Sequence, residues 1–137
     1  MSQTDSREPV YVIDGYGMIY RSYYAFMRTP IRNAKGQNMS AVFGYFRVLA
    51  SFIRQYRPHY LAVAMDSRTP TFRDELFVAY KATRQATPDE LKEQFPIIEA
   101  VMHALGLPML RVDGFEADDI LATVARRCSD EGRECVV

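Results

Sequence analysis

The chain has 137 residues, of which 48% are hydrophobic and 25% are charged, a balance that suits one globular domain and excludes a disordered tail. Seventeen basic residues offset seventeen acidic ones, so any binding to nucleic acid has to come from local clusters of charge. No segment has the apolar length of a signal peptide or a membrane span, and we expect a soluble, cytoplasmic protein with no membrane partner.

The cysteines and histidines disfavour a zinc site. Cys128 and Cys135 do not form a CxxC pair, and His59 and His103 lie far from them in the sequence. Zinc sites usually combine closely spaced Cys and His ligands. Two reduced, partly buried thiols are therefore the better interpretation.

The chain begins with a predicted strand and helix. The apolar run Pro9–Ile13 is rich in strand formers and ends at Asp14, which predicts a buried strand. Apolar residues then recur at helical spacing until Thr29 and Pro30, where proline disfavours a further helical turn. A polar, glycine-containing loop follows, up to Met39.

A second helix and a second strand come next. Ser40 is predicted to cap a helix whose apolar positions alternate steps of four and three, and which ends at Arg57. The run Tyr60–Met65 predicts a strand that leads directly into Asp66. Two predicted strands therefore end in an aspartate.

The segment from 67 to 84 is basic. On a helix that begins near Thr69, the spacing puts Arg73, Phe77, Lys81 and Arg84 on one face. Such a face, with aromatic rings interleaved, suits a nucleic-acid backbone, but a solvated helical face has the same pattern. The segment alone does not decide between the two.

A further helix is predicted from residue 87 onward. Thr87–Glu90 has the sequence of a capping box, with proline at the first helical position. Apolar residues continue at helical spacing as far as Leu105, with a possible kink at Pro96 and a stop at Gly106.

The last part of the chain predicts strand, helix and strand. Met109–Val112 is a short strand, a helix reaches about Ser129, and Glu134–Val137 begins a fourth strand. Strands that alternate with helices predict an α/β fold, a three-layer, mostly parallel sheet with helices on both faces.

Three carboxylates lie within four positions where the turn after the third strand becomes a helix: Glu116, Asp118 and Asp119. Like charges this close raise one another's pKa unless a cation lies among them. Acidic residues are also favoured in a first helical turn, where they cap free N–H groups and complement the macrodipole. Taken alone, the cluster favours this capping role.

Asp14 and Asp66 favour a metal-binding role for this acidic cluster. In a parallel sheet the carboxyl ends of the strands meet at one edge, where ligands gather. Two strand-terminal aspartates beside the 116–119 cluster make an all-oxygen site, which suits Mg²⁺ or Mn²⁺. A pair of such ions roughly 3.5–4 Å apart can activate water for in-line attack on a phosphate. The pattern therefore predicts a nuclease.

The chain resembles the 5′→3′ exonuclease domain of bacterial DNA polymerase I. The resemblance covers nearly the whole chain, and the five motifs together are highly specific. They are, in order and spacing, Ile13-Asp14-Gly15, Met65-Asp66, Thr71-Phe72-Arg73-Asp74-Glu75, Tyr80-Lys81-Ala82-Thr83-Arg84 and Gly114-Phe115-Glu116-Ala117-Asp118-Asp119.

The resemblance implies a PIN-like flap-endonuclease fold that removes RNA primers and 5′ flaps from nicked duplex DNA in repair and replication. It implies a two-metal site with Mg²⁺ or Mn²⁺, in which Asp119 acts through water. It also implies that the segment of about 69–95 is a helical clamp for a single-stranded 5′ end. The implied metal ligands are Asp14, Asp66, Glu116, Asp118 and Asp119, with Lys81 and Arg84 at the scissile phosphate and Arg21, Arg73, Phe77 and Tyr80 as further DNA contacts.

The resemblance also implies parts that follow residue 137. In the family, the strand begun at Glu134 continues to further aspartates and a helix-hairpin-helix, and polymerase domains are expected in the full-length protein. We therefore expect residues 1–137 to be the N-terminal part of the domain, with weak metal binding and slow or no cleavage alone.

Two alternatives remain. A catalytically incomplete fragment would bind nucleic acid through Arg73, Lys81 and Arg84 without needing a metal, and its affinity would fall steeply with salt. A phospho-acceptor receiver domain also gathers aspartates at strand ends, but it needs an acidic pair after the first strand, where this chain has only Asp14.

Overall fold

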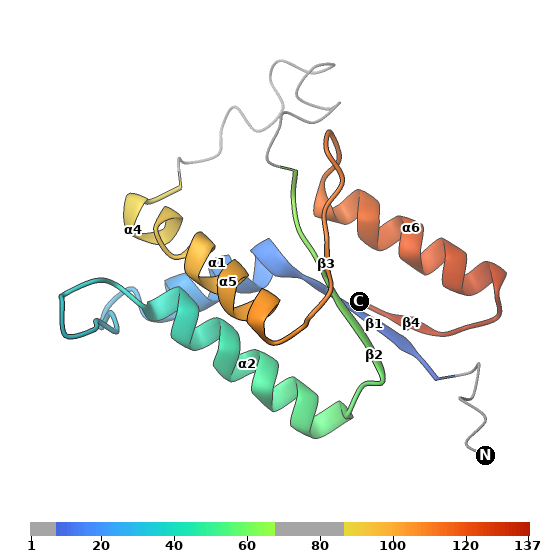
Figure 1. The fold of residues 1–137 in the computed structure, drawn as a ribbon, viewed down its shortest axis with the longest axis horizontal. Helices are drawn as coiled ribbons and strands as arrows, with labels where there is room; N and C mark the ends of the chain where they lie inside the picture. Colours follow the sequence, from blue (N-terminus) through green and yellow to red (C-terminus); the bar gives the residue numbers. More distant parts are fainter. Residues whose placement is uncertain (1–7, 68–86) are drawn as a thin grey trace. The chain divides into compact units, whose positions relative to one another are not determined.

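The computed structural model describes residues 8–67 and 87–137, and the chain divides into two compact units (Figure 1). One unit consists of Met1–Gly15, Pro58–Thr83 and Leu107–Val137, and the other of Tyr16–Arg57 and Arg84–Gly106. The candidate carboxylates all belong to the first unit. No helix in the described part of the chain combines the length and the apolar composition that a membrane span requires.

A parallel sheet forms the centre of the first unit. Its strands, in the order β3-β2-β1-β4, are β1 (Val10–Asp14), β2 (Tyr60–Ala64), β3 (Met109–Leu110) and β4 (Cys135–Val136). Each neighbouring pair is parallel, which confirms the predicted α/β class. The register places Asp14 opposite Ala64, so Asp66 continues past the same edge two residues further on.

Helix α6 (Ala117–Asp130) packs on this sheet. Ile120 and Leu121 form one buried cluster with Val12 of β1 and Ala64 of β2. This face is the one that the helical spacing of the apolar residues predicted. The cluster fixes the N-terminus of α6, and with it the acidic stretch, to the strands that end in Asp14 and precede Asp66.

Gly15 directly follows β1 and lies against residues at the end of β2. A Cβ atom at this position would come within 2.8 Å of Val63 Cγ1 and closer still to Met65 Sδ. A glycine is therefore required directly after Asp14, because any side chain would push the two strand ends apart.

The second unit is helical, with α1 (Gly15–Ala25), α2 (Ser40–Tyr56), α4 (Asp89–Lys92) and α5 (Phe95–Ala104). Helix α2 has the predicted bounds. The single helix predicted from residue 87 is instead two helices, α4 and α5, with Pro96 in the first turn of α5. Proline is tolerated there because those N–H groups have no intrahelical partner. Leu105, the last residue of the apolar helical pattern predicted from the sequence, is 62% exposed because α5 ends before it.

The N-terminus of α2 is capped differently from the prediction. Ser40 is the first helical residue, and its Oγ accepts a hydrogen bond from the Ile31 N–H at 2.9 Å. The fully buried Gln94 caps the helix instead, because its Oε1 accepts from the N–H groups of Ala41 at 2.8 Å and Val42 at 3.2 Å. Ser40 was thus wrongly predicted as the cap, since a side chain 53 residues away takes that role.

The predicted capping box at Thr87–Glu90 is also wrong. Thr87 Oγ1 lies 2.6 Å from Tyr20 Oη, and Glu90 accepts hydrogen bonds from Asn38 Nδ2 at 3.0 Å and Arg32 NH1 at 3.2 Å. These two hydrogen bonds hold the pKa of Glu90 below its ordinary value, and the one from Asn38 has the larger effect. Both side chains therefore tie other segments to α4 rather than capping it.

Candidate metal centre

Asp66 connects the end of β2 to the start of α6. Its Oδ1 accepts a hydrogen bond from the Ala117 N–H at 2.7 Å, and its backbone carbonyl accepts one from Arg111 Nε at 3.0 Å. The side chain therefore points at the positive end of the α6 dipole, where a carboxylate is stabilised. The predicted convergence of β2 and the acidic stretch is present in this contact.

Glu116 and Asp119 form a reciprocal capping box at α6. Glu116 is the N-cap, its side chain accepts the Asp119 N–H, and Asp119 Oδ2 accepts the Glu116 N–H at 2.9 Å. The Glu116 side chain is buried, with Oε1 enclosed. The capping role considered from the sequence is confirmed for these two residues, whereas the exposed Asp118 lies in the first turn without forming part of the box.

Ser67 fixes the turn that precedes Glu116. Its Oγ accepts a hydrogen bond from the Gly114 N–H at 3.0 Å, and its own N–H donates to the Phe115 carbonyl at 3.2 Å. Gly114 has φ +84°, a left-handed conformation that glycine adopts without strain. The sequence did not identify Ser67 or Arg111, and the only signal for Ser67 is a hydroxyl directly after a strand-terminal aspartate.

The donor set of this edge fits a hard divalent cation in kind, since every candidate ligand is a carboxylate. Within residues 8–67 and 87–137, however, no three acidic, His or Cys side chains gather closely enough to hold a metal ion. Backbone N–H groups at the start of α6 instead donate hydrogen bonds to some of the carboxylate oxygens. A carboxylate has about four lone-pair sites, so a cap hydrogen bond leaves room for a cation.

Of the predicted DNA contacts, one lies in the second unit, and the others lie outside the residues that the structure describes. Arg21 is exposed on α1, donates from Nε to the Gly17 carbonyl at 3.3 Å, and lines a hollow of about 690 Å³ between α1 and α2. Arg73, Phe77, Tyr80, Lys81 and Arg84 lie outside the described residues. All these assignments stay predictions.

The family described as "5'-3' exonuclease, N-terminal resolvase-like domain" matches residues 9–137. The chain belongs to this family. The family resemblance that the sequence motifs indicated is therefore confirmed.

Two relatives illustrate the range of the family. The DNA polymerase I of Treponema pallidum (strain Nichols) is 49% identical over 131 residues, which are 96% of this chain and 13% of that protein. The 5′-3′ exonuclease of Aquifex aeolicus (strain VF5) is 37% identical over 123 residues, 90% of this chain and 42% of that protein. The chain thus spans less than half the length of each of these two relatives.

Solved structures show that the fold is that of a 5′-exonuclease. T5 5′-exonuclease with bound zinc matches with a TM-score of 0.62 at 22% identity, over 89% of this chain and 45% of that one. A T5 flap endonuclease in a pseudo-enzyme-product complex with DNA and metal ions matches with a TM-score of 0.56 at 19% identity, over 89% and 45%. These neighbours confirm the predicted PIN-like fold.

Substitutions at Asp66 should separate its structural contact from its charge. In Asp66→Asn the amide oxygen can still accept the Ala117 N–H, so thermal unfolding should change little, whereas Asp66→Ala should lose about 0.5–2 kcal/mol, the usual cost of losing a cap. Both variants should lose divalent-metal binding, measured by calorimetry, because both remove a negative oxygen donor. Equal stability of the two variants would contradict the cap, and unchanged metal affinity in Asp66→Asn would contradict the ligand assignment.

Proposed function

We propose that this chain provides the catalytic carboxylates of a metal-dependent 5′→3′ exonuclease and 5′-flap endonuclease that hydrolyses phosphodiesters in DNA replication and repair. Family membership supports the reaction class. The observation that carries the assignment is the 2.7 Å hydrogen bond from the Ala117 N–H to Asp66 Oδ1, because it brings a strand-terminal carboxylate to the acidic first turn of α6. As in the DNA polymerase I relatives, polymerase domains would belong to the same full-length protein.

The metal would be Mg²⁺ or Mn²⁺, in a two-ion site held by Asp14, Asp66, Glu116, Asp118 and Asp119. When bound, such ions lower the pKa of a coordinated water and neutralise charge on the phosphate. The chain itself keeps the donors in place. The Ala117 N–H fixes Asp66, and the capping box fixes Glu116 and Asp119, so little reorganisation is needed when the substrate arrives.

The substrate would be DNA with a 5′ flap or nick, or an RNA primer, in the cytoplasm where bacterial DNA is replicated. Lys81 and Arg84 would stabilise charge on the scissile phosphate. The further contacts would be Arg21 and Arg73 to phosphates and Phe77 and Tyr80 to bases.

The test is cleavage of a labelled 5′-flap DNA by a protein that carries this chain within the full length of its relatives. We expect 5′ products that require Mg²⁺ or Mn²⁺ and that disappear with EDTA. The 137-residue chain should be assayed alongside at increasing salt. DNA binding by both proteins without any metal-dependent product would contradict the nuclease and favour the binding module.

A further inference from the structure

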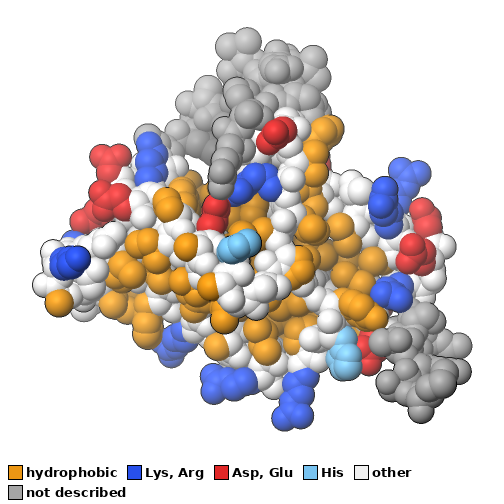
Figure 2. All heavy atoms as spheres, in the orientation of Figure 1, with side chains coloured by type: hydrophobic (Ala, Val, Ile, Leu, Met, Phe, Trp, Pro, Cys, Tyr) orange, Lys and Arg blue, Asp and Glu red, His pale blue; other side chains and the backbone are white. Residues whose placement is uncertain are grey.

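The turn between β3 and α6 is rigid in its backbone and apolar at its surface. The Phe115 N–H donates to the Val112 carbonyl at 3.1 Å, and Ser67 holds the Phe115 carbonyl and the Gly114 N–H. Yet Phe115 is 45% exposed and Val112 is 49% exposed. Figure 2 shows hydrophobic side chains at the surface of this turn. Phe115 is thus about half-exposed at a turn that hydrogen bonds hold in place.

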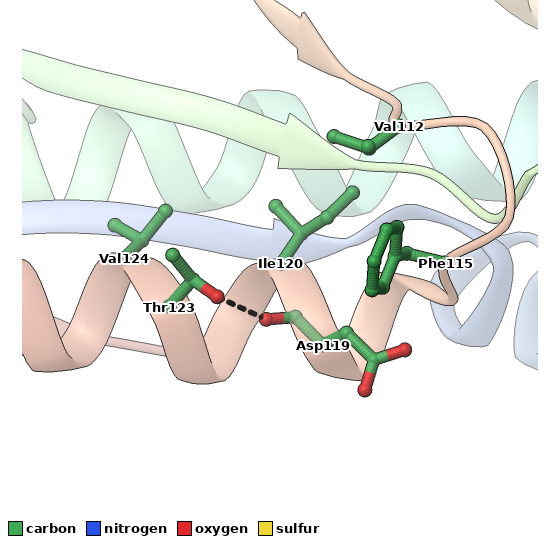
Figure 3. A pocket seen from close by; sticks show the side chains of 6 residues that line it. All are labelled: Val112, Phe115, Asp119, Ile120, Thr123 and Val124. Atoms are coloured by element: carbon green, nitrogen blue, oxygen red, sulfur yellow. Dashed lines mark hydrogen bonds between the residues drawn. The ribbon is translucent and has the colours of Figure 1, made fainter. Parts of the chain in front are cut away.

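Phe115 forms one wall of a hollow on α6. The hollow has a volume of about 270 Å³ and is lined by Val112, Phe115, Asp119, Ile120, Thr123 and Val124 (Figure 3). Ile120 and Val124 point from the helix to the side where Val112 and Phe115 lie. The Thr123 hydroxyl is directed inward to the helix, because it donates to the Asp119 carbonyl at 2.8 Å.

The lining selects the kind of group that can bind. Among residues 8–67 and 87–137, the lining contains no Lys or Arg and its charged residue is the acidic Asp119, so these residues offer a phosphate no attraction. Ligand pockets for drug-sized molecules are about 300–1,000 Å³, so this smaller hollow fits one flat ring system. A partly exposed phenylalanine next to apolar side chains is the surface on which such a ring stacks.

The place of the hollow connects it to the carboxylates. Phe115 directly precedes Glu116, with about 3.8 Å between their Cα atoms, and Asp119 belongs to both the hollow and the capping box. A nucleotide whose phosphate lies at the carboxylates therefore has its base within reach of Phe115. In one nucleotide, the phosphate needs a cation and the base needs an apolar face, and the two surfaces adjoin here.

We propose that the hollow lined by Val112, Phe115, Ile120 and Val124 is a nucleobase site, in which Phe115 stacks on the base of a nucleotide beside the scissile phosphate. This inference rests on the proposed nuclease function. Stacking on an aromatic side chain accepts every base, so the site positions the strand without reading its sequence.

The test measures DNA binding by the purified 137-residue chain with Mg²⁺ present, because the phosphate needs a cation at the carboxylates and this chain alone is expected to cleave slowly or not at all. The probe is a 5′-flap DNA with 2-aminopurine beside the scissile phosphate, and its fluorescence should change on stacking. Phe115→Ala should weaken binding roughly 10- to 100-fold, the range that loss of one stacked base gives, and should remove the fluorescence change. Phe115→Tyr should keep both, whereas Phe115→Leu, which is apolar but not aromatic, should lose the fluorescence change.

A second DNA, with an abasic residue in place of the 2-aminopurine, completes a double-mutant cycle between Phe115 and the base. The native chain should bind the abasic DNA as weakly as Phe115→Ala binds the intact DNA. Phe115→Ala should bind the abasic DNA with the same affinity as the native chain does. The matched control is Leu105→Ala, an exposed apolar residue of the second unit, which should change neither signal. Thermal unfolding is measured for every variant, because Phe115 is only 45% exposed and a loss of binding has to be distinguished from a loss of folded protein.

Three results would overturn the inference: native affinity and fluorescence in Phe115→Leu, equal effects of Phe115→Ala on intact and abasic DNA, or no binding of either DNA. Failure of the nuclease proposal has a different signature. It would appear as uncut flap DNA with Mg²⁺ in the full-length protein, whatever residue stands at position 115.

Discussion

Asp118→Ala is expected to abolish 5′-flap cleavage in a protein that carries this chain within the full length of its relatives. The side chain is exposed in the first turn of α6 and lies outside the capping box, so its loss should cost the fold only about 0.3–1 kcal/mol of dipole interaction. If Asp118 is a ligand, its loss weakens the binding of an ion that stabilises the transition state by several kcal/mol, so the rate should fall roughly 10³-fold or more. Single-turnover cleavage and thermal unfolding measure the two effects.

Asp130→Ala is the matched control, since Asp130 is an exposed aspartate at the opposite end of the same helix. It removes the same charge from α6 without touching the sheet edge, and its cleavage rate should stay near that of the native protein. A rate loss of less than about tenfold in Asp118→Ala, or an equal loss in both variants, would contradict the role of Asp118.

Gln94→Leu is expected to destabilise the second unit strongly. Gln94 is fully buried, accepts the N–H groups of Ala41 and Val42, and donates from Nε2 to the Glu90 carbonyl at 3.0 Å. Leucine has a similar size but no polar atoms, so two N–H groups at the start of α2 and one carbonyl would lose their partner. A buried group left unsatisfied costs about 1–3 kcal/mol. Only the Ala41 hydrogen bond is buried and the other two are part-buried, so we expect a total of about 2–4 kcal/mol.

For a chain of this length such a loss should lower Tm by on the order of 10 °C. Thermal unfolding followed by circular dichroism measures it, with Gln55→Leu, at an exposed position of α2, as the control that should change Tm little. A Tm of Gln94→Leu within about 2 °C of the native value would show that α2 does not depend on this cap.

The position of the candidate site could be predicted because its main signal is local. Each of two short apolar runs leads directly into an aspartate, Asp14 or Asp66, and parallel pairing places the ends of such runs at one edge. The apolar spacing on α6 likewise predicted the face that packs on the sheet. These features follow from periodicity within a few residues, which the chain retains when it folds.

The caps could not be predicted, because they depend on residues that meet only in the folded chain. Ser40 and Thr87 have the sequence of helix caps, but the structure gives each of them a partner from a distant segment, the Ile31 N–H and the Tyr20 hydroxyl. Gln94, which caps α2, carries no local signal at all. A side chain 53 residues away can replace a local cap whenever it is buried beside the helix end.

The acidic stretch shows why composition alone does not identify a metal site. Glu116 and Asp119 satisfy the capping pattern in full, so their presence needs no metal. A third hydrogen bond, from the Ala117 N–H to Asp66 Oδ1, brings a carboxylate from the end of another strand to the same helix end, as the strand-end pattern predicted. That contact distinguishes the edge from an ordinary helix start.

The most direct test is a crystal structure of the chain soaked in Mn²⁺, with the ion located by anomalous scattering. We predict Mn²⁺ at the carboxyl edge of the sheet, bound through oxygens of Asp14, Asp66, Glu116 or Asp118, at about 2.0–2.3 Å. Mn²⁺ bound elsewhere on the chain, or at the edge with none of these residues as ligands, would contradict the assignment of this edge as the catalytic centre.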